Sequence, residues 1–242
     1  MKMILIFLLS FSGPISQAEN ILTLLKDSDR SRGGVGQGIT WMVNIKSWEN
    51  EVQTERNFKV KAKDSNAYVE SADTGRFKGE TFLFNDRTIW FFKPSLKKPV
   101  SISARERLSG QAANGDIAST NYFKDYNPTL IKKEMIQDES VVVLLLKAKN
   151  KSMTYDQIRY WIREKDKLGL KAEFLTLSGK VFKIASFKYN NFILVKSKKI
   201  PFISEMLIQD ANRLANKSIL TYDKPILDEI SDNIFNVNNL NR

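Results

Sequence analysis

Histidine and cysteine, the residue types most often found at catalytic and metal centres, are absent from this chain of 242 residues. Their absence excludes Cys-His and Ser-His-Asp nucleophile systems, zinc sites of the usual ligand types and the commonest general base near neutral pH. A carboxylate pair or a Ser-Lys arrangement remains formally possible, but no spacing in the sequence favours either one. The sequence therefore predicts no catalytic residue, no metal site and no cofactor.

A glycine-rich stretch is a second place to look for chemistry. RGGVGQG, residues 32–38, could suggest a phosphate-binding loop, but no strand precedes it and no Lys-Ser/Thr pair follows it. We interpret it as a flexible connection between a helix and a strand. A lipid hydrolase is a weak hypothesis, because the chain lacks a Gly-x-Ser-x-Gly nucleophile elbow and any histidine base. The protein is therefore predicted not to be an enzyme.

The first eighteen residues differ from the rest of the chain. Lys2 supplies a positive charge, Met3 to Phe11 is an almost unbroken apolar run, and small residues stand at Ser16 and Ala18. This pattern is typical of a secretory signal peptide that is cleaved after Ala18. We expect residues 1–18 to be that signal peptide and residues 19–242 to form a single soluble, exported domain.

The charge balance bears on the class of partner. The chain carries 38 Lys and Arg against 27 Asp and Glu, a formal net charge of +11. Such a surface attracts nucleic acid, an acidic membrane face or an acidic protein. Export makes nucleic acid the least favoured of these, so no nucleic-acid partner is predicted. Because the chain has no cysteine, burial must hold the exported fold without disulfides.

The hydrophobic pattern predicts one helix followed by many strands. Ile21, Leu24 and Leu25 share one side of a short amphipathic helix. From Ile39 the period changes to 2, and ITWMVNIKSW and FKVKAK each alternate apolar with polar residues. Each of these strands therefore has an apolar face and a solvated face.

A hairpin is predicted in FLFNDRTIWFF, residues 82–92, with Asn85-Asp86 as its two-residue turn. This turn pairs Phe82 with Ile89. Further strands are expected at SVVVLLLKAK, QIRYWIREK, LKAEFLTLSG, KVFKIASFKYN, ISEMLIQDA and SILTYDKPIL. About ten strands with one or two helices predict a mainly β fold, a large antiparallel sheet that curls as strand twist accumulates.

The predicted sheet has more apolar surface than the N-terminal helix can cover, which suggests a ligand site on its concave face. The stretch RLSGQAANGDIASTNY, residues 107–122, consists mostly of Gly, Ala, Ser, Asn and Thr. Its small residues favour a segment packed closely against the sheet. Two interpretations stay open, a fixed covering loop and a mobile flap over the concave face.

The order of elements resembles the outer-membrane lipoprotein-sorting family of LolA-like periplasmic carriers over nearly the whole chain after the signal. The most specific part is the Trp90 to Pro94 step, followed by the RLSG and GDIASTNY steps. The stretches that carry the likeness are the N-terminal helix with its Gly-rich link, RTIWFFKPSLKKPVSISARERLSGQAANGDIASTNYFKDY, YWIREKDKLGLKAEFLTLSGKVFKIASF and ISDNIFNVNNL.

The resemblance implies a LolA/LppX-like incomplete β-barrel, in which helices lid the concave face of a curved sheet and the hollow holds acyl chains. It implies a periplasmic protein that takes its cargo from an inner-membrane ABC or RND-type transporter towards an outer-membrane acceptor. The cargo could be a lipoprotein or a free lipid. An alternative is a non-carrying accessory protein that docks on an inner-membrane exporter.

Three sets of site residues follow from these interpretations. Ile21, Leu24 and Leu25 of the helix are expected to plug the hollow until cargo displaces them. Lys93, Lys97 and Lys98 form a basic loop that could meet an anionic membrane or an acidic transporter surface. Apolar residues on the strand faces are expected to line the hollow. They are Trp41, Val43, Ile45, Phe58, Val60, Phe82, Phe84, Ile89, Phe91, Ile158 and Tyr160.

Overall fold

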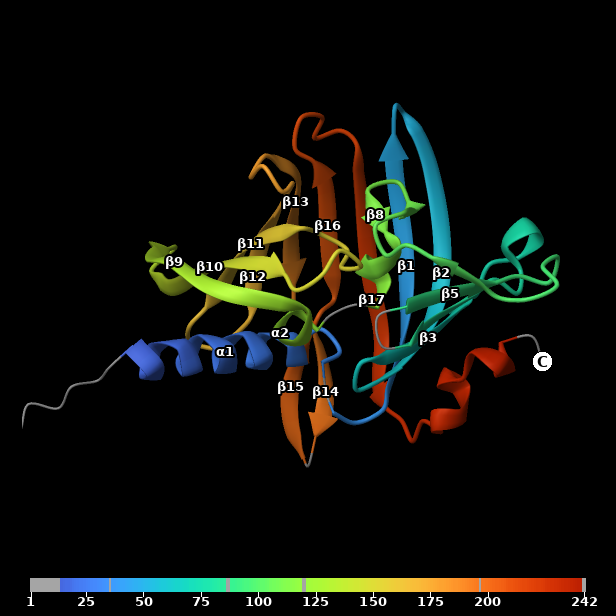
Figure 1. Cartoon of the computed structure of the whole chain (residues 1–242), viewed down its shortest axis with the longest axis horizontal. Coiled ribbons are helices and arrows are strands. Elements are labelled where there is room, and N and C mark those ends of the chain that lie inside the picture. The colour runs from blue at the N-terminus through green and yellow to red at the C-terminus, as the bar shows by residue number, and fades with distance from the viewer. Residues whose placement is uncertain (1–13, 35, 86–87, 119–120, 196, 241–242) are drawn as a thin grey trace, which may run out of the picture.

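The computed structural model describes residues 14–34, 36–85, 88–118, 121–195 and 197–240. The main element is a 13-stranded antiparallel sheet whose order is β6-β5-β4-β3-β2-β1-β17-β16-β13-β12-β11-β10-β9. The sheet is curved and does not close into a barrel, because β6 and β9 remain as its two edges (Figure 1). This confirms the predicted fold class.

The N-terminal half of the chain supplies one side of this sheet, and the C-terminal half supplies the other. The first side comprises β1 (Ile39–Glu49), β2 (Val52–Lys63), β3 (Asn66–Ser71), β4 (Thr81–Asn85), β5 (Thr88–Phe92) and β6 (Val100–Ile102). The second comprises β9 (Tyr126–Ile136), β10 (Glu139–Ala148), β11 (Gln157–Arg163), β12 (Gly169–Leu175), β13 (Val181–Lys188), β16 (Glu205–Asp210) and β17 (Lys217–Leu227). They meet where β1 pairs with β17.

Two small hairpins and short helices complete the described structure. The hairpins are β7 (Arg107–Ser109) with β8 (Ala112–Ala113), and β14 (Asn191–Val195) with β15 (Lys198–Phe202). The α-helices are α1 (Pro14–Arg30) and α2 (Tyr122–Asp125). Short 3-10 helices are η1 (Gly75–Phe77), η2 (Asn114–Ile117), η3 (Asp232–Phe235) and η4 (Val237–Asn239). No helix in the described part of the chain is long and apolar enough to cross a membrane.

Helix α1 ends where the glycine-rich stretch predicts. Gly33 has a φ of 107°, and the Gly34 N–H donates to the carbonyl of Asp29 at 2.9 Å. This bond, from the residue after the positive-φ glycine back into the last turn of the helix, is the usual glycine-based helix stop. The helix begins at Pro14, so a cut after Ala18 would fall inside it. Residues 1–13 of the predicted signal peptide lie outside the described residues.

The β4–β5 hairpin has the predicted strands and faces but a different register. Phe82 pairs with Phe91, and Phe84 pairs with Ile89, so the predicted pairing of Phe82 with Ile89 is wrong. Asn85, predicted to lie in the turn, is itself paired with Thr88. Residues 86–87 lie outside the described residues. The register differs by an even number of residues, so every side chain keeps its face.

The alternation of apolar and polar residues predicts that the opposite face of the sheet is solvated. The structure shows that part of this face is covered. Ile230, Phe235 and Leu240 of the C-terminal segment pack against Leu83 on the outer face of β4 and form a second, smaller core. Leu83 is fully buried between this segment and the sheet. The C-terminal residues that contribute to the family resemblance therefore cover the outer face of the N-terminal half.

Candidate functional site: the covered inner face of the sheet

The strand residues expected to line the hollow lie together on one face of the sheet, which we call the inner face. All of them belong to one hydrophobic cluster, and all except Phe91, which is half-buried, are buried. Cross-strand pairing brings them together: Trp41 is opposite Val60, and Val43 is opposite Phe58. The structure therefore places these residues on a common apolar surface, and their contact with a ligand stays a proposal.

Several segments pack over the inner face, and we call them together the cover. Helix α1 is one of them. Leu24 and Leu25 are buried in the inner-face cluster, and Ile21 packs against it half-buried. Leu22, on the other side of the helix, is exposed. The helix thus has the amphipathic orientation that the spacing of its apolar residues predicts. Its displacement by cargo is a separate matter, which depends on how the cover is held.

The segment at residues 107–122 supplies a second part of the cover. Gly110, with a φ of 52°, lies so close to Ser47 that a Cβ there would come within 2.4 Å of the serine Cβ. The next residue, Gln111, donates its N–H to the Ser218 hydroxyl at 2.8 Å. Residues 111–117 are buried throughout. The small residues of this segment therefore allow a close backbone approach, and the geometry favours the covering loop.

A buried carboxylate holds this segment to the loop before β11. Asp116 accepts hydrogen bonds from the Tyr155 hydroxyl at 2.7 Å and from the Ala113 N–H at 2.8 Å. Burial raises the pKa of Asp116, while the nearby Lys183 opposes that rise. Burial also lowers the pKa of Lys183, whose Nζ donates to the Gln111 carbonyl at 2.6 Å. The cover is thus fixed by polar contacts as well as by packing.

A second buried polar cluster stands at the end of α1. The Asp29 carboxylate accepts the Phe123 N–H at 2.8 Å and so joins α1 to α2. Burial raises the pKa of Asp29 to about 7, with Arg32 opposing the rise. The Arg32 guanidinium lies 4.1 Å from the ring centre of Tyr122, a cation–π contact, and its Nη2 is 3.9 Å from Asp29 Oδ1. This ion pair is loose for groups so deeply buried.

Several polar atoms beneath the cover lack a hydrogen bond. Within the described part of the chain, Asp29 Oδ1, Arg32 Nε and Trp41 Nε1 are buried and have no hydrogen-bond partner. Unsatisfied buried donors and acceptors are costly, at roughly 1–3 kcal/mol each. The covered state therefore carries a penalty that opening of the cover would relieve.

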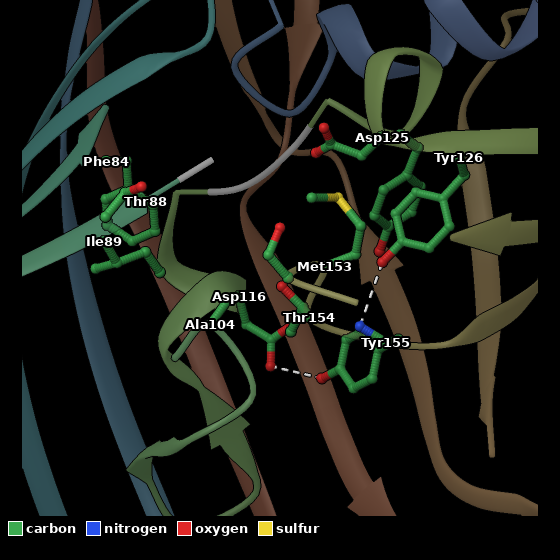
Figure 2. Close-up of a pocket in the computed structure, with 12 residues that line it drawn as sticks. Phe84, Thr88, Ile89, Ala104, Asp116, Asp125, Tyr126, Met153, Thr154 and Tyr155 are labelled. Atoms are coloured by element: carbon green, nitrogen blue, oxygen red, sulfur yellow. Dashed lines mark hydrogen bonds between the residues drawn. The ribbon is translucent and has the colours of Figure 1, made fainter. Parts of the chain in front are cut away.

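A small pocket lies between the cover and the sheet (Figure 2). Its volume is about 40 Å³, and it is lined by Phe84 and Ile89 of the sheet together with Asp116, Tyr126 and Tyr155. That is room for roughly three waters, far less than an acyl chain needs. An acyl chain would have to displace covering segments to enter at this pocket. No group of three or more carboxylates in the described part of the chain could hold a metal ion.

The predicted docking lysines follow β5 at the other end of the sheet. Lys97 and Lys98 are exposed, and Lys93 is half-buried. The structure therefore leaves the two later lysines free to meet a partner surface.

The buried polar residues were not singled out in the sequence. Asp29 and Arg32 have the spacing of an ordinary exposed pair at a helix end, and Asp116 stands in a segment that looks like a polar loop. The sequence offers only a weak signal for this cluster. In NYFKDY, residues 121–126, Tyr122 and Tyr126 stand four residues apart beside charged residues. The contacts themselves join residues far apart in the chain, such as Asp29 and Phe123.

Comparisons with known proteins agree with this architecture. A LolA superfamily protein from Nitrosomonas europaea is 30% identical with a TM-score of 0.78, and the match covers 88% of this chain and 96% of that chain. A putative outer membrane lipoprotein-sorting protein domain from Vibrio parahaemolyticus shares the fold at 20% identity and a TM-score of 0.76, covering 93% and 100%. A DUF1329 family protein from Desulfovibrio piger does so at 16% identity and a TM-score of 0.76, covering 95% and 100%.

Sequence comparisons add two findings. The model of a family described only as an uncharacterized protein matches residues 63–242. No curated protein sequence matches the chain.

Proposed function

From its membership of the LolA superfamily, we propose that this chain is a non-enzymatic periplasmic carrier. In this proposal the inner face of its sheet holds the acyl chains of a lipoprotein or a lipid. The observation that carries the proposal is the nature of the cover. An apolar sheet face is closed by helices, loops and two small hairpins, and not by a second large sheet. Such segments can move away without breaking the 13-stranded sheet.

Displacement explains how such a carrier could both hold and release its cargo. Each buried methylene contributes about 0.8 kcal/mol, so one acyl chain of ordinary length offers roughly 10 kcal/mol before ordering costs. Leu24 and Leu25 each contribute about 1.5–3 kcal/mol when they occupy the same surface. The affinity for cargo is then the difference between two apolar contacts. A modest change in either contact shifts the balance.

The binding test uses the purified full-length mature protein and a fluorescent fatty acid. We expect saturable binding with a stoichiometry near one, and acyl-containing lipids in organic extracts of the native protein, detected by mass spectrometry. Phe91→Glu should abolish binding without unfolding, because Phe91 is the half-buried member of the surface. Met135→Glu, at an exposed position on β9, is the matched control. A protein that neither binds the probe nor carries lipid would refute the carrier function.

The partners in this proposal are an inner-membrane ABC or RND-type transporter that delivers cargo and an outer-membrane acceptor that receives it. Export by a cleaved signal peptide and a single domain over residues 19–242 belong to the same proposal. The exposed Lys97 and Lys98 are proposed as part of the surface that meets the transporter. The positive net charge of the chain supports an acidic partner surface.

A second candidate function is supported by the pocket between the cover and the sheet, because its volume of about 40 Å³ is too small for an acyl chain. In this alternative the protein docks on an inner-membrane exporter through its basic loop and carries nothing. The double variant Lys97→Glu, Lys98→Glu would then fail to co-purify with membranes containing the exporter, while Phe91→Glu would behave like the wild type. The carrier proposal instead expects Phe91→Glu to lose lipid binding, whether or not the basic loop is needed for docking.

A further inference from the structure

The β14–β15 hairpin has an apolar outer face that no segment among the described residues covers. Phe192 is 53% exposed and Leu194 is 62% exposed. The register pairs Phe192 with Pro201 and Leu194 with Lys199, so these four residues share one face of the hairpin. Large apolar side chains at two alternate positions of one strand therefore point into solvent.

The other face of the hairpin is firmly attached to the molecule. Ile193 and Phe202 are buried in the main cluster, and the Phe202 ring lies 5.8 Å from that of Trp41 in an edge-on contact. Just after β15, the Ile203 N–H donates to the Ser31 carbonyl at 2.8 Å. The hairpin is thus held to the sheet and to the chain that follows α1. Figure 1 shows it extending below α1 in that view.

The charged residues of the hairpin are of one sign. Lys199 shares the face of the exposed apolar residues, with its Nζ 5.8 Å from the centre of the Phe192 ring, and Lys198 is exposed next to it at the end of the hairpin, paired with Val195. The sequence from residue 189 to residue 204 contains no aspartate or glutamate. An apolar side-chain pair bordered by lysines, in a hairpin whose own sequence has no acidic residue, matches the boundary between acyl chains and anionic headgroups.

We propose that the outer face of the β14–β15 hairpin docks on the surface of an anionic phospholipid bilayer. Phe192 and Leu194 enter the headgroup boundary, while Lys198 and Lys199 remain among the phosphates. A stable protein–protein interface buries roughly 1,200–2,000 Å² in total, far more than a pair of side chains can supply. Weak, reversible attachment to a membrane needs only a small apolar insertion with a few lysines. The bilayer is therefore the occupant that these residues fit.

This proposal goes beyond carriage of cargo, because it concerns the outer face of the hairpin and not the covered inner face. Its test uses cargo-free mature protein and vesicles of 30% phosphatidylglycerol and 70% phosphatidylethanolamine, with pure phosphatidylcholine vesicles as the neutral control. We expect co-sedimentation with the anionic vesicles, weaker binding at high salt and little binding to the neutral ones. Failure of fatty-acid binding would leave this result unchanged, so the two proposals can fail separately.

The variants separate the two contributions. The double variant Phe192→Ser, Leu194→Ser should lower the partition constant at least tenfold, and Lys198→Glu, Lys199→Glu should lower it at least fivefold for each lysine. The matched controls are Leu177→Ser, at a position 77% exposed, and Lys165→Glu, Lys180→Glu, which changes the charge equally at two other exposed lysines. Both controls should bind as the wild type does.

A positional readout guards against variants that are merely unstable. Phe192→Trp should lose fluorescence with anionic vesicles that contain brominated lipid, whereas Leu177→Trp should not exceed the background of the native tryptophans. Wild-type protein that ignores the vesicles would overturn the proposal. So would hairpin variants that bind normally, or a hairpin-dependent dimer seen by light scattering in place of vesicle binding.

Discussion

Asp29 joins the two helices that cover the inner face, and its ionisation should weaken that cover. Its Oδ2 accepts the Phe123 N–H, its Oδ1 has no hydrogen-bond partner among the described residues, and Arg32 is 3.9 Å away. Burial raises the pKa of Asp29 from 3.8 to about 7, against the opposing effect of Arg32. The substitution Asp29→Asn removes this titration and keeps an oxygen that can accept the Phe123 N–H.

The size of the effect follows from proton linkage. Because the folded-state pKa is higher than the unfolded value, the folded protein binds more protons between pH 3.8 and about 7. Stability from this group is complete below the unfolded pKa and is lost as the pH rises through the folded pKa. At about 1.4 kcal/mol per pH unit, the free energy of unfolding should fall by about 3 kcal/mol between pH 5 and pH 8 on account of Asp29.

Urea denaturation followed by tryptophan fluorescence measures this difference. The wild type should lose about 3 kcal/mol more than Asp29→Asn between pH 5 and pH 8. Asp116 is present in both proteins, so its own contribution cancels in the comparison. Asp27→Asn, which removes a partly exposed carboxylate from the same helix, should keep the wild-type slope. Parallel pH profiles for the wild type and Asp29→Asn would refute the reasoning.

Three further substitutions test the loop segments of the cover and the outer-face core, each by urea denaturation. Gly110→Ala should lower the free energy of unfolding by about 2–3 kcal/mol, because the added Cβ collides with Ser47 of the sheet at a positive φ. Gly75→Ala, also at positive φ but in open space, should lower it by about 1 kcal/mol. Equal losses would contradict the close approach at Gly110. Tyr155→Phe removes a hydrogen-bond donor to the buried Asp116 and should lower the free energy of unfolding by about 1–3 kcal/mol. An unchanged free energy of unfolding would show that this bond does not stabilise the cover. Phe235→Ala should cost about 3–5 kcal/mol if the C-terminal segment is part of the folded core, and no change would show that it is not.

The strands were predictable because their residues alternate with a period of two. Trp41, Val43, Ile158 and Tyr160 were each assigned to the inner face from that pattern, and each is buried there. The pattern depends only on neighbours in sequence, so it survives the register error in the β4–β5 hairpin. The end of α1 was predictable for a similar reason, since a glycine stop is a local signal.

The polar contacts beneath the cover were not predictable, because they depend on residues far apart in the chain. Asp29 meets Phe123 across 94 positions, and Gln111 meets Ser218 across 107. A polar residue near a helix end or in a small-residue loop looks solvated until the fold buries it. The outer-face core formed by Phe235 and Leu83 was missed for the same reason, since alternation says which face is apolar but not what covers the other one.

Displacement of the cover makes a prediction that a preformed cavity does not. If cargo and α1 compete for one surface, Leu25→Ala removes only the contact of the helix, and fatty-acid affinity should rise by as much as thirtyfold for a loss of about 2 kcal/mol. Leu22→Ala, at an exposed position on the other side of the helix, removes no such contact and should leave the affinity unchanged. A preformed cavity would give a different pattern, with affinity unchanged or lowered by Leu25→Ala.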